Sequence, residues 1–154
     1  MKFQAVLNCA SPRDHYMVDA VVLWCIDRRF RGAYRALTDY LHISADRVKL
    51  AGGTKSLSDS ATQEDRNVAV KNLGAAVTLH AARKILLTAH TDCGAYGGLA
   101  YFGNDTEAER AHLANELWAS AAYVGGIFKL PVECYFVDFE GIHRLEEQQE
   151  LTRP

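Results

Sequence analysis

Short apolar runs alternate along this chain with segments of helical periodicity. The clearest run, from Val18 to Cys25, is almost continuous in apolar residues, as in a parallel strand that is buried on both faces of a sheet. Other runs predict further strands at 47–51, 84–90 and 132–139. Strands that alternate with helices favour a mostly parallel sheet with right-handed crossover connections and helices on its faces.

Helices are predicted between these strands. The first has an apolar stripe at helical spacing, formed by Phe30, Tyr34, Leu37 and Leu41. The second opens at Thr62, and Asp65 stands where a capping box requires an acceptor. The third starts at Thr106, which Glu109 follows at the same spacing, and it ends before Pro131 because proline cannot continue a helix.

These elements predict a single α/β domain over residues 1–154, with three layers. Its centre is a mostly parallel β-sheet of about four strands in the order 2-1-3-4, flanked by helices. Residues 1–17 contain the alternating stretch QAVLNC, which indicates either an edge strand or an N-terminal arm onto a partner. Sheets of this class bind ligands beyond the carboxyl ends of their strands. With the first and third strands as neighbours, Cys25 and His90 are expected to end side by side.

Composition excludes several classes of function. The 154 residues are 49% hydrophobic and 23% charged, which is typical of a globular domain with a real core. Because 17 Lys and Arg residues stand against 19 Asp and Glu residues, we expect no nucleic-acid partner. No stretch approaches the ~20 apolar residues of a membrane-spanning helix. Residues 1–15 lack the apolar run of a signal peptide, so we expect a cytoplasmic location.

The cysteines are the remaining candidates for chemistry: Cys9, Cys25, Cys93 and Cys134. In a cytosolic chain, metal binding or catalysis is a better explanation for them than a disulfide framework. Cys25 ends the first predicted strand, and His90 ends the third, with two residues between it and Cys93. Two thiolates and an imidazole make three of the four positions of a tetrahedral zinc site, with the fourth left open as in catalytic sites. The other two cysteines are expected to be packed thiols.

These two segments resemble the signature of the β-class carbonic anhydrases, Cys-x-Asp-x-Arg followed by His-x-x-Cys. The matching positions are Cys25, Asp27, Arg29, His90 and Cys93. The resemblance implies that Cys25, His90 and Cys93 bind Zn²⁺. It also implies that Asp27 either takes the fourth position or pairs with Arg29, and that the protein is a homodimer or a higher homo-oligomer.

The resemblance covers about residues 18–145 and suggests a short, divergent member, in which Arg28 stands where the family usually has a small residue. It implies a lyase of the carbonate dehydratase type, in which a zinc-bound hydroxide reversibly hydrates carbon dioxide to bicarbonate. Two thiolates cancel the charge of the ion, so Arg29 is expected to help bound water to ionise. Turns or a substrate pocket beside the site are expected to use three glycines: Gly52, Gly53 and Gly94.

Other functions remain open. Carbonyl sulfide and carbon disulfide are linear and apolar like carbon dioxide, so a hydrolase of either small molecule fits the same site, as does a non-catalytic zinc-binding protein. A remote alternative needs no metal, because the spacing of Cys25 and Arg31 after a strand resembles the phosphate loop of cysteine-dependent phosphatases. In that case Asp27 would repel a phosphate dianion, and His90 and Cys93 would have no role.

Overall fold

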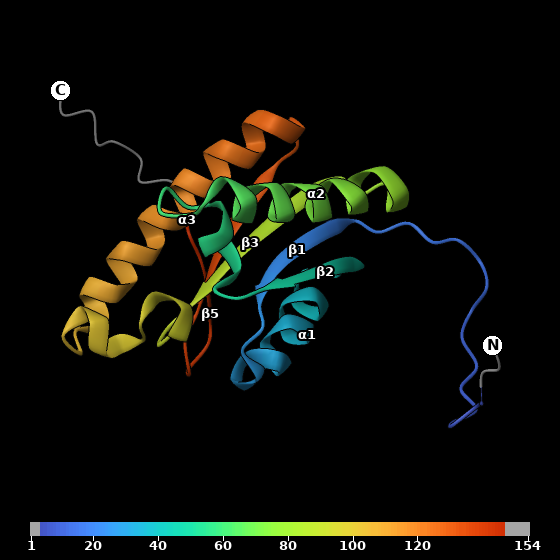
Figure 1. Ribbon diagram of the computed structural model, residues 1–154, viewed down its shortest axis with the longest axis horizontal. Coiled ribbons are helices and arrows are strands. Elements are labelled where there is room, and N and C mark those ends of the chain that lie inside the picture. The colour runs from blue at the N-terminus through green and yellow to red at the C-terminus, as the bar shows by residue number, and fades with distance from the viewer. Residues whose placement is uncertain (1–3, 147–154) are drawn as a thin grey trace.

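A five-stranded sheet forms the centre of the computed structural model, which describes residues 4–146 (Figure 1). Its strands are β1 (Ala20–Cys25), β2 (Ala45–Leu50), β3 (Lys84–His90), β4 (Val132–Val137) and β5 (Ile142–Arg144). They lie in the order β2-β1-β3-β4-β5, and only the pairing of β4 with β5 is antiparallel. The predicted order of four strands is confirmed. The sheet also has a fifth strand, β5, which is too short for its hydrophobic alternation to be recognised.

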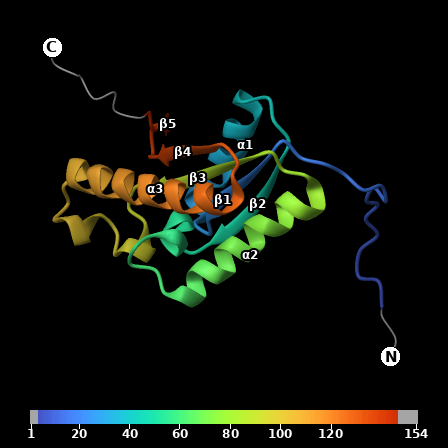
Figure 2. The ribbon, with the colours of Figure 1, turned by 90° about the horizontal axis from the view of Figure 1, so that it is seen from above.

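Helices cover the two faces of the sheet unequally. The long helices α2 (Gln63–His80) and α3 (Thr106–Phe128) lie on one face, and α1 (Arg31–Tyr40) lies on the other (Figure 2). The connections contain short 3-10 helices: η1 (Arg28–Phe30), η2 (Gly53–Leu57), η3 (Gly94–Tyr96) and η4 (Leu99–Phe102). The predicted three-layer α/β architecture is therefore confirmed.

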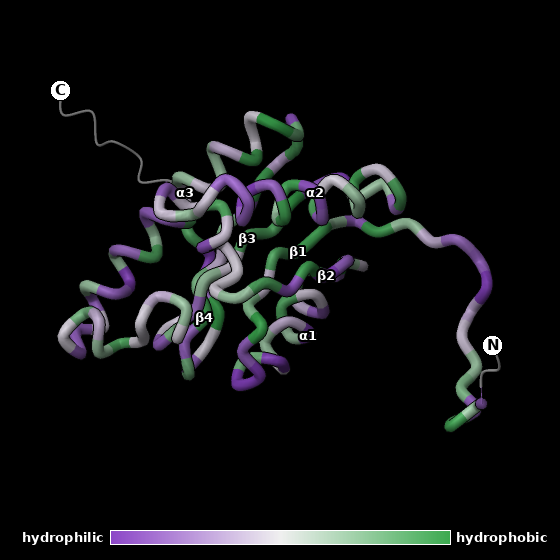
Figure 3. The backbone as a smooth tube through the Cα atoms, viewed as in Figure 1, coloured by the Kyte–Doolittle hydropathy of each residue, from purple (hydrophilic) through white to green (hydrophobic). Residues whose placement is uncertain are grey.

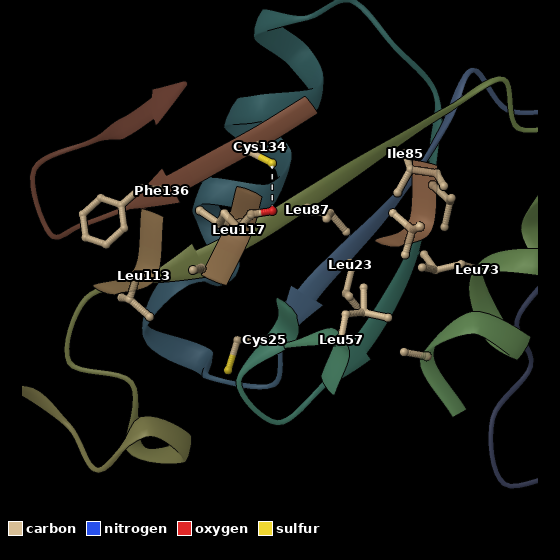
Figure 4. Close-up of a cluster of buried hydrophobic side chains, with 14 of the residues drawn as sticks. Leu23, Cys25, Leu57, Leu73, Ile85, Leu87, Leu113, Leu117, Cys134 and Phe136 are labelled. Carbon is tan, nitrogen blue, oxygen red and sulfur yellow. Dashed lines mark hydrogen bonds between the residues drawn. The ribbon is translucent and has the colours of Figure 1, made fainter. Parts of the chain in front are cut away.

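Strand β1 contributes to both layers of the core. All six of its residues are buried, and successive side chains of a strand point to opposite faces of the sheet. Val21, Leu23 and Cys25 join the core under α2 and α3, whereas Val22 and Trp24 join the core under α1. Figure 3 shows the apolar character of this strand, and Figure 4 shows Cys25 at its end, at the margin of the larger core.

Local capping interactions begin the two long helices. At the start of α2, the side chains of Thr62 and Asp65 each accept a hydrogen bond from the backbone of the other, which is the predicted capping box. Helix α3 is capped by Asp105, whose carboxylate accepts two backbone N–H groups of the first turn. Helix α3 thus begins at Thr106 as predicted, but its capping residue is Asp105, one position earlier than the Thr106–Glu109 spacing indicates. Glu109 does not serve the cap but points into the protein, where it is 1% exposed.

Residues 4–17 run away from the sheet as exposed chain and form no strand (Figure 1). Near the end of this segment the Tyr16 hydroxyl donates a hydrogen bond to Asp46 at 3.2 Å, and its ring centroid lies 4.1 Å from that of His80. Of the two alternatives for this segment, the arm onto a partner stays a prediction. Within residues 4–146, no helix combines the length and the apolar character that crossing a membrane requires.

Candidate metal centre

Cys25, His90 and Cys93 come together where β1 and β3 end. Cys25 is the last residue of β1 and His90 is the last residue of β3, and Cys93 follows three residues later. The two sulfur atoms and a ring nitrogen of His90 all lie within 4.8 Å of one another. The three side chains are buried, with residue exposures between 2% and 5%. Two chain segments that are 65 residues apart thus deliver one compact group of metal-ligating atoms.

The chemistry of this group fits a zinc ion. His90 Nδ1 lies 2.8 Å from the carbonyl oxygen of Thr91, which can only accept, so Nδ1 carries a hydrogen and the neutral ring keeps its lone pair on Nε2. Within the described residues, Nε2 is buried and has no hydrogen-bond partner. Buried polar atoms without a partner are rare and call for an explanation. A cation held by this nitrogen and the two thiolates supplies one.

The two thiols influence each other's ionisation. The Cys93 thiol stabilises the Cys25 thiolate by a hydrogen bond and thereby lowers the pKa of Cys25 in spite of burial. The same pairing, reinforced by burial, raises the pKa of Cys93. One thiolate is therefore favoured even without a cation. A bound cation would favour the second thiolate as well, because metal binding displaces thiol protons.

Asp27 lies outside this group and binds Arg29. Its Oδ2 accepts from Arg29 Nη2 at 2.7 Å and from Nε at 3.0 Å, while its Oδ1 accepts from the Arg29 backbone N–H at 2.9 Å. Hydrogen bonds from the guanidinium lower the pKa of Asp27 to about 2. Of the two arrangements that the resemblance implies, the structure therefore contains the pairing of Asp27 with Arg29.

A second carboxylate, that of Asp92, binds the other side of the same guanidinium. Asp92 Oδ2 accepts from Arg29 Nη1 at 2.8 Å, and the Asp92 carbonyl oxygen accepts from Nη2 at 2.8 Å. The other carboxylate oxygen, Oδ1, accepts the backbone N–H of Leu99 at 2.9 Å. Arg29 thereby joins the loop after β1 to the loop after β3. The sequence gives no signal for this contact, because no spacing rule relates residues so far apart.

Glu109 reaches the same loop from within the protein. Its Oε1 accepts the backbone N–H of Asp92 at 2.7 Å, and its Oε2 accepts the hydroxyl of Thr91 at 2.5 Å. It belongs to the first turn of α3, where the partial positive charge of the helix end favours a carboxylate. Sequence reasoning missed this role because Glu109 stands at the spacing of an ordinary capping residue after Thr106.

Aromatic rings cover the outer side of His90. The Phe30 ring centroid lies 4.5 Å from that of His90, and Phe139 stacks on Phe30 at 5.4 Å. The Arg29 guanidinium lies 5.7 Å from the Phe30 centroid and 5.6 Å from that of Phe139. Phe139 is 67% exposed, so the contacting rings of Phe30 and Phe139 extend from the buried imidazole of His90 to the protein surface.

The predicted glycine turn is pressed against the end of β1. Gly52 and Gly53 have φ of +75° and +55°, in the left-handed region that favours glycine. A Cβ on Gly53 would lie 2.9 Å from the Thr88 carbonyl oxygen and 3.2 Å from the backbone nitrogen of Cys25. Gly94 differs, since a Cβ there would meet no atom within 4 Å. Close packing therefore accounts for Gly53 and not for Gly94.

Three other residues considered from the sequence lie apart from the metal-ligating group. Arg31, the second residue of the phosphatase hypothesis, begins α1 and is exposed. Cys134 is a packed thiol as predicted: it donates to the Leu117 carbonyl oxygen at 3.6 Å (Figure 4), and burial raises its pKa to about 12. Cys9 is exposed in the segment before β1, so the prediction that it packs in the core is wrong.

Comparison with known proteins gives a match in structure alone, since no protein-family model and no curated protein matches the sequence. A carbonic anhydrase from Streptococcus mutans is 15% identical, with a TM-score of 0.60 over 90% of this chain and 88% of that one. β-Carbonic anhydrase isoform I from Trichomonas vaginalis is 12% identical, with a TM-score of 0.56 over 89% and 87%. A carbon disulfide hydrolase is 15% identical, with a TM-score of 0.50 over 86% and 81%. This chain therefore has the fold of the β-carbonic anhydrases, which its Cys-x-Asp-x-Arg and His-x-x-Cys segments resemble.

Proposed function

We propose that this protein is a zinc-dependent carbonic anhydrase that reversibly hydrates carbon dioxide to bicarbonate. The observation that carries the proposal is the convergence of Cys25, His90 and Cys93 at one edge of a carbonic anhydrase fold. When bound there, zinc supplies the Lewis acidity that activates a water for attack on carbon dioxide at neutral pH. Three protein donors leave one position of a tetrahedral ion free for that chemistry.

Asp27 and Arg29 position the reacting water in this proposal. Arg29 keeps Asp27 ionised, so the carboxylate accepts a hydrogen bond from water and does not donate one. Arg29 itself lies between two carboxylates, those of Asp27 and Asp92, and the three side chains together carry a net negative charge. Arg29 therefore orients Asp27 and supplies no net positive charge, in contrast to the electrostatic help that was expected of it.

A second candidate is hydrolysis of carbon disulfide or carbonyl sulfide by the same residues. It is supported by the similarity to a carbon disulfide hydrolase, whose 15% identity equals that of the Streptococcus mutans carbonic anhydrase. These molecules share the linear, apolar shape of carbon dioxide. The route by which a molecule reaches the candidate metal centre would therefore determine which of them is the substrate. A non-catalytic zinc-binding protein would use the same three ligands without turnover.

We also propose that the protein is cytoplasmic and forms a homodimer or a higher homo-oligomer. All four cysteines are free, as expected in a reducing compartment. Val6 and Leu7 in the segment before β1 are 96% and 80% exposed. A second chain that covered these neighbouring apolar side chains would remove their exposed surface from water, which favours association.

The proposal is tested by metal analysis of the purified protein together with stopped-flow hydration of carbon dioxide. We expect one zinc per chain and measurable turnover, both lost in Cys25→Ser. Cys9→Ser is the matched control, because this exposed thiol lies outside the group, and it should keep both properties. Zinc with turnover of carbon disulfide alone would select the second candidate. A wild-type protein that binds no zinc would contradict the proposal.

A further inference from the structure

We infer that Glu109 is a positioning residue for the candidate metal centre formed by Cys25, His90 and Cys93. Glu109 fixes the short loop between His90 and Cys93 so that both side chains face one ion. The inference rests on the proposed metal site and extends it to a residue on another element. Among the described residues, the side-chain hydrogen bonds of Glu109 go to none of the three candidate ligands. It acts on Thr91 and Asp92, the two residues that separate the ligands in the chain.

The loop between the ligands contains a backbone conformation that surrounding contacts support. Asp92 has φ of +51°, a left-handed conformation that residues other than glycine adopt infrequently. Such a conformation persists where surrounding contacts determine it, and it is common at ligand sites. If Asp92 relaxed to an ordinary conformation, the directions of His90 and Cys93 would change relative to each other. The geometry of the group therefore depends on what holds Asp92.

Glu109 supplies the buried part of that support. One of its oxygens takes the Asp92 backbone N–H at 2.7 Å and the other takes the Thr91 hydroxyl, so one carboxylate holds both residues. Hydrogen bonds to an ionised acceptor are stronger than neutral ones. The helix that carries Glu109 is anchored in the core by Leu113 and Leu117, both fully buried. The core thus fixes the position of the helix, and the carboxylate of Glu109 fixes the loop relative to the helix.

The charge of Glu109 has no other evident purpose in the described residues. The neighbouring Arg110 binds Asp138 at 3.0 Å and not Glu109. Burying a carboxylate is costly, and a well-packed apolar residue of similar volume often stabilises a fold as well or better. A carboxylate at this position is therefore best explained by the two directed hydrogen bonds that it accepts from the loop.

The test measures zinc affinity by competition with a chelator, and the absorption spectrum of the cobalt-substituted protein, well below the unfolding temperature. In Glu109→Leu we expect affinity to fall by about 10–100-fold, the usual effect of losing a group that orients ligands. The cobalt spectrum should change as well, since it reports ligand geometry. Glu109→Gln should recover most of the affinity, because its amide oxygen can still accept the Asp92 N–H. Glu107→Gln, in the same helical turn but exposed, is the matched control and should match wild type.

Thr91→Val gives an independent measurement that does not depend on how Glu109→Leu folds. It removes one of the two hydrogen bonds, and we expect about a fivefold loss of affinity, as for one ordinary hydrogen bond. Unchanged affinity and an unchanged cobalt spectrum in folded Glu109→Leu would overturn the inference and leave the proposed function standing. If Glu109→Leu does not fold, unchanged affinity in Thr91→Val overturns it. A wild-type protein without zinc affinity would instead contradict the proposed function, and this inference with it.

Discussion

Arg29 holds Asp92 through two hydrogen bonds, from Nη1 to the carboxylate and from Nη2 to the backbone carbonyl oxygen, each 2.8 Å long. The two residues stand 63 positions apart in the chain. Because Arg29 also holds Asp27, this contact makes the guanidinium a rigid link between the loops after β1 and β3. The orientation of Asp27 thus depends on a carboxylate contributed by the loop after another strand, β3.

Asp92→Asn tests that dependence. Asparagine tolerates the left-handed backbone of this position and can still accept the Leu99 N–H, but it loses the charge-assisted bond to Arg29. We expect kcat/KM for carbon dioxide hydration to fall by about tenfold with zinc content unchanged, within the range for residues that orient a metal site. Asp39→Asn, on an exposed carboxylate of α1, is the control. Wild-type kinetics in Asp92→Asn would show that Arg29 needs no second carboxylate.

Gly53→Ala should destabilise the protein. Its φ is +55°, and a Cβ would stand 2.9 Å from the Thr88 carbonyl oxygen, an atom of the rigid backbone of β3. Strain of this kind costs about 1–3 kcal/mol of unfolding free energy. Gly94→Ala is the matched control, because a Cβ there meets nothing within 4 Å, and it should stay within about 0.5 kcal/mol of wild type. Urea unfolding measures the stability of both variants. Equal midpoints for the two would contradict the close approach of Gly53 to the Thr88 carbonyl oxygen.

Leu117→Ala should lower the stability of the protein without changing the geometry of the candidate metal centre. Leu117 is fully buried under the sheet, so the variant should lose about 2–5 kcal/mol of unfolding free energy, as large-to-small changes in a core do. Ile127→Ala on the same helix removes a side chain from a residue that is 45% exposed, and it should cost much less. Chemical denaturation gives the difference. We expect zinc affinity of folded Leu117→Ala to stay near wild type, because Leu113, one turn nearer to Glu109, still anchors that end of α3 in the core.

Asp138 should make stability depend on pH in the acid range. Burial alone would raise its pKa, but the backbone N–H groups of Glu140 and Gly141 and the side chain of His143 outweigh burial and lower it. A carboxyl whose pKa is lower in the folded state stabilises the protein above its unfolded value of about 3.9, and this contribution is lost as pH falls through the folded value. Wild type should therefore lose more stability than Asp138→Asn below about pH 4. Urea midpoints between pH 7 and pH 3 test this, and parallel curves for the two proteins would count against it.

The sequence was sufficient to predict the elements that bury long apolar runs and the strand ends that carry chemistry. β1 is recognisable because both of its faces are buried, and the positions of Cys25 and His90 follow from its pairing with β3. Contacts between distant polar residues were not predictable, since nothing in their spacing relates Arg29 to Asp92. Glu109 was misassigned because a local capping pattern and a long-range role use the same residue type at the same spacing.

The elements without a repeating pattern were also beyond prediction. Strand β5 has three residues, so its alternation is too short to register, although its pairing with β4 is clear in the structure. Cys9 stands in a segment whose alternating residues indicated an edge strand or an arm, yet residues 4–17 are all exposed and form no strand. Burial of such a segment depends on what surface lies beside it, which no property of the segment itself reveals.

X-ray absorption at the zinc edge of the purified, catalytically assayed protein tests the central claim most directly, because it counts the atoms bound to the ion. Coordination by Cys25, His90 and Cys93 predicts two sulfur atoms at about 2.3 Å, one imidazole nitrogen at about 2.0–2.1 Å and one further light atom. Cys93→Ser should lower the sulfur count to one. A zinc ion with no sulfur neighbours, or with four protein ligands in the active protein, would contradict the proposed metal centre.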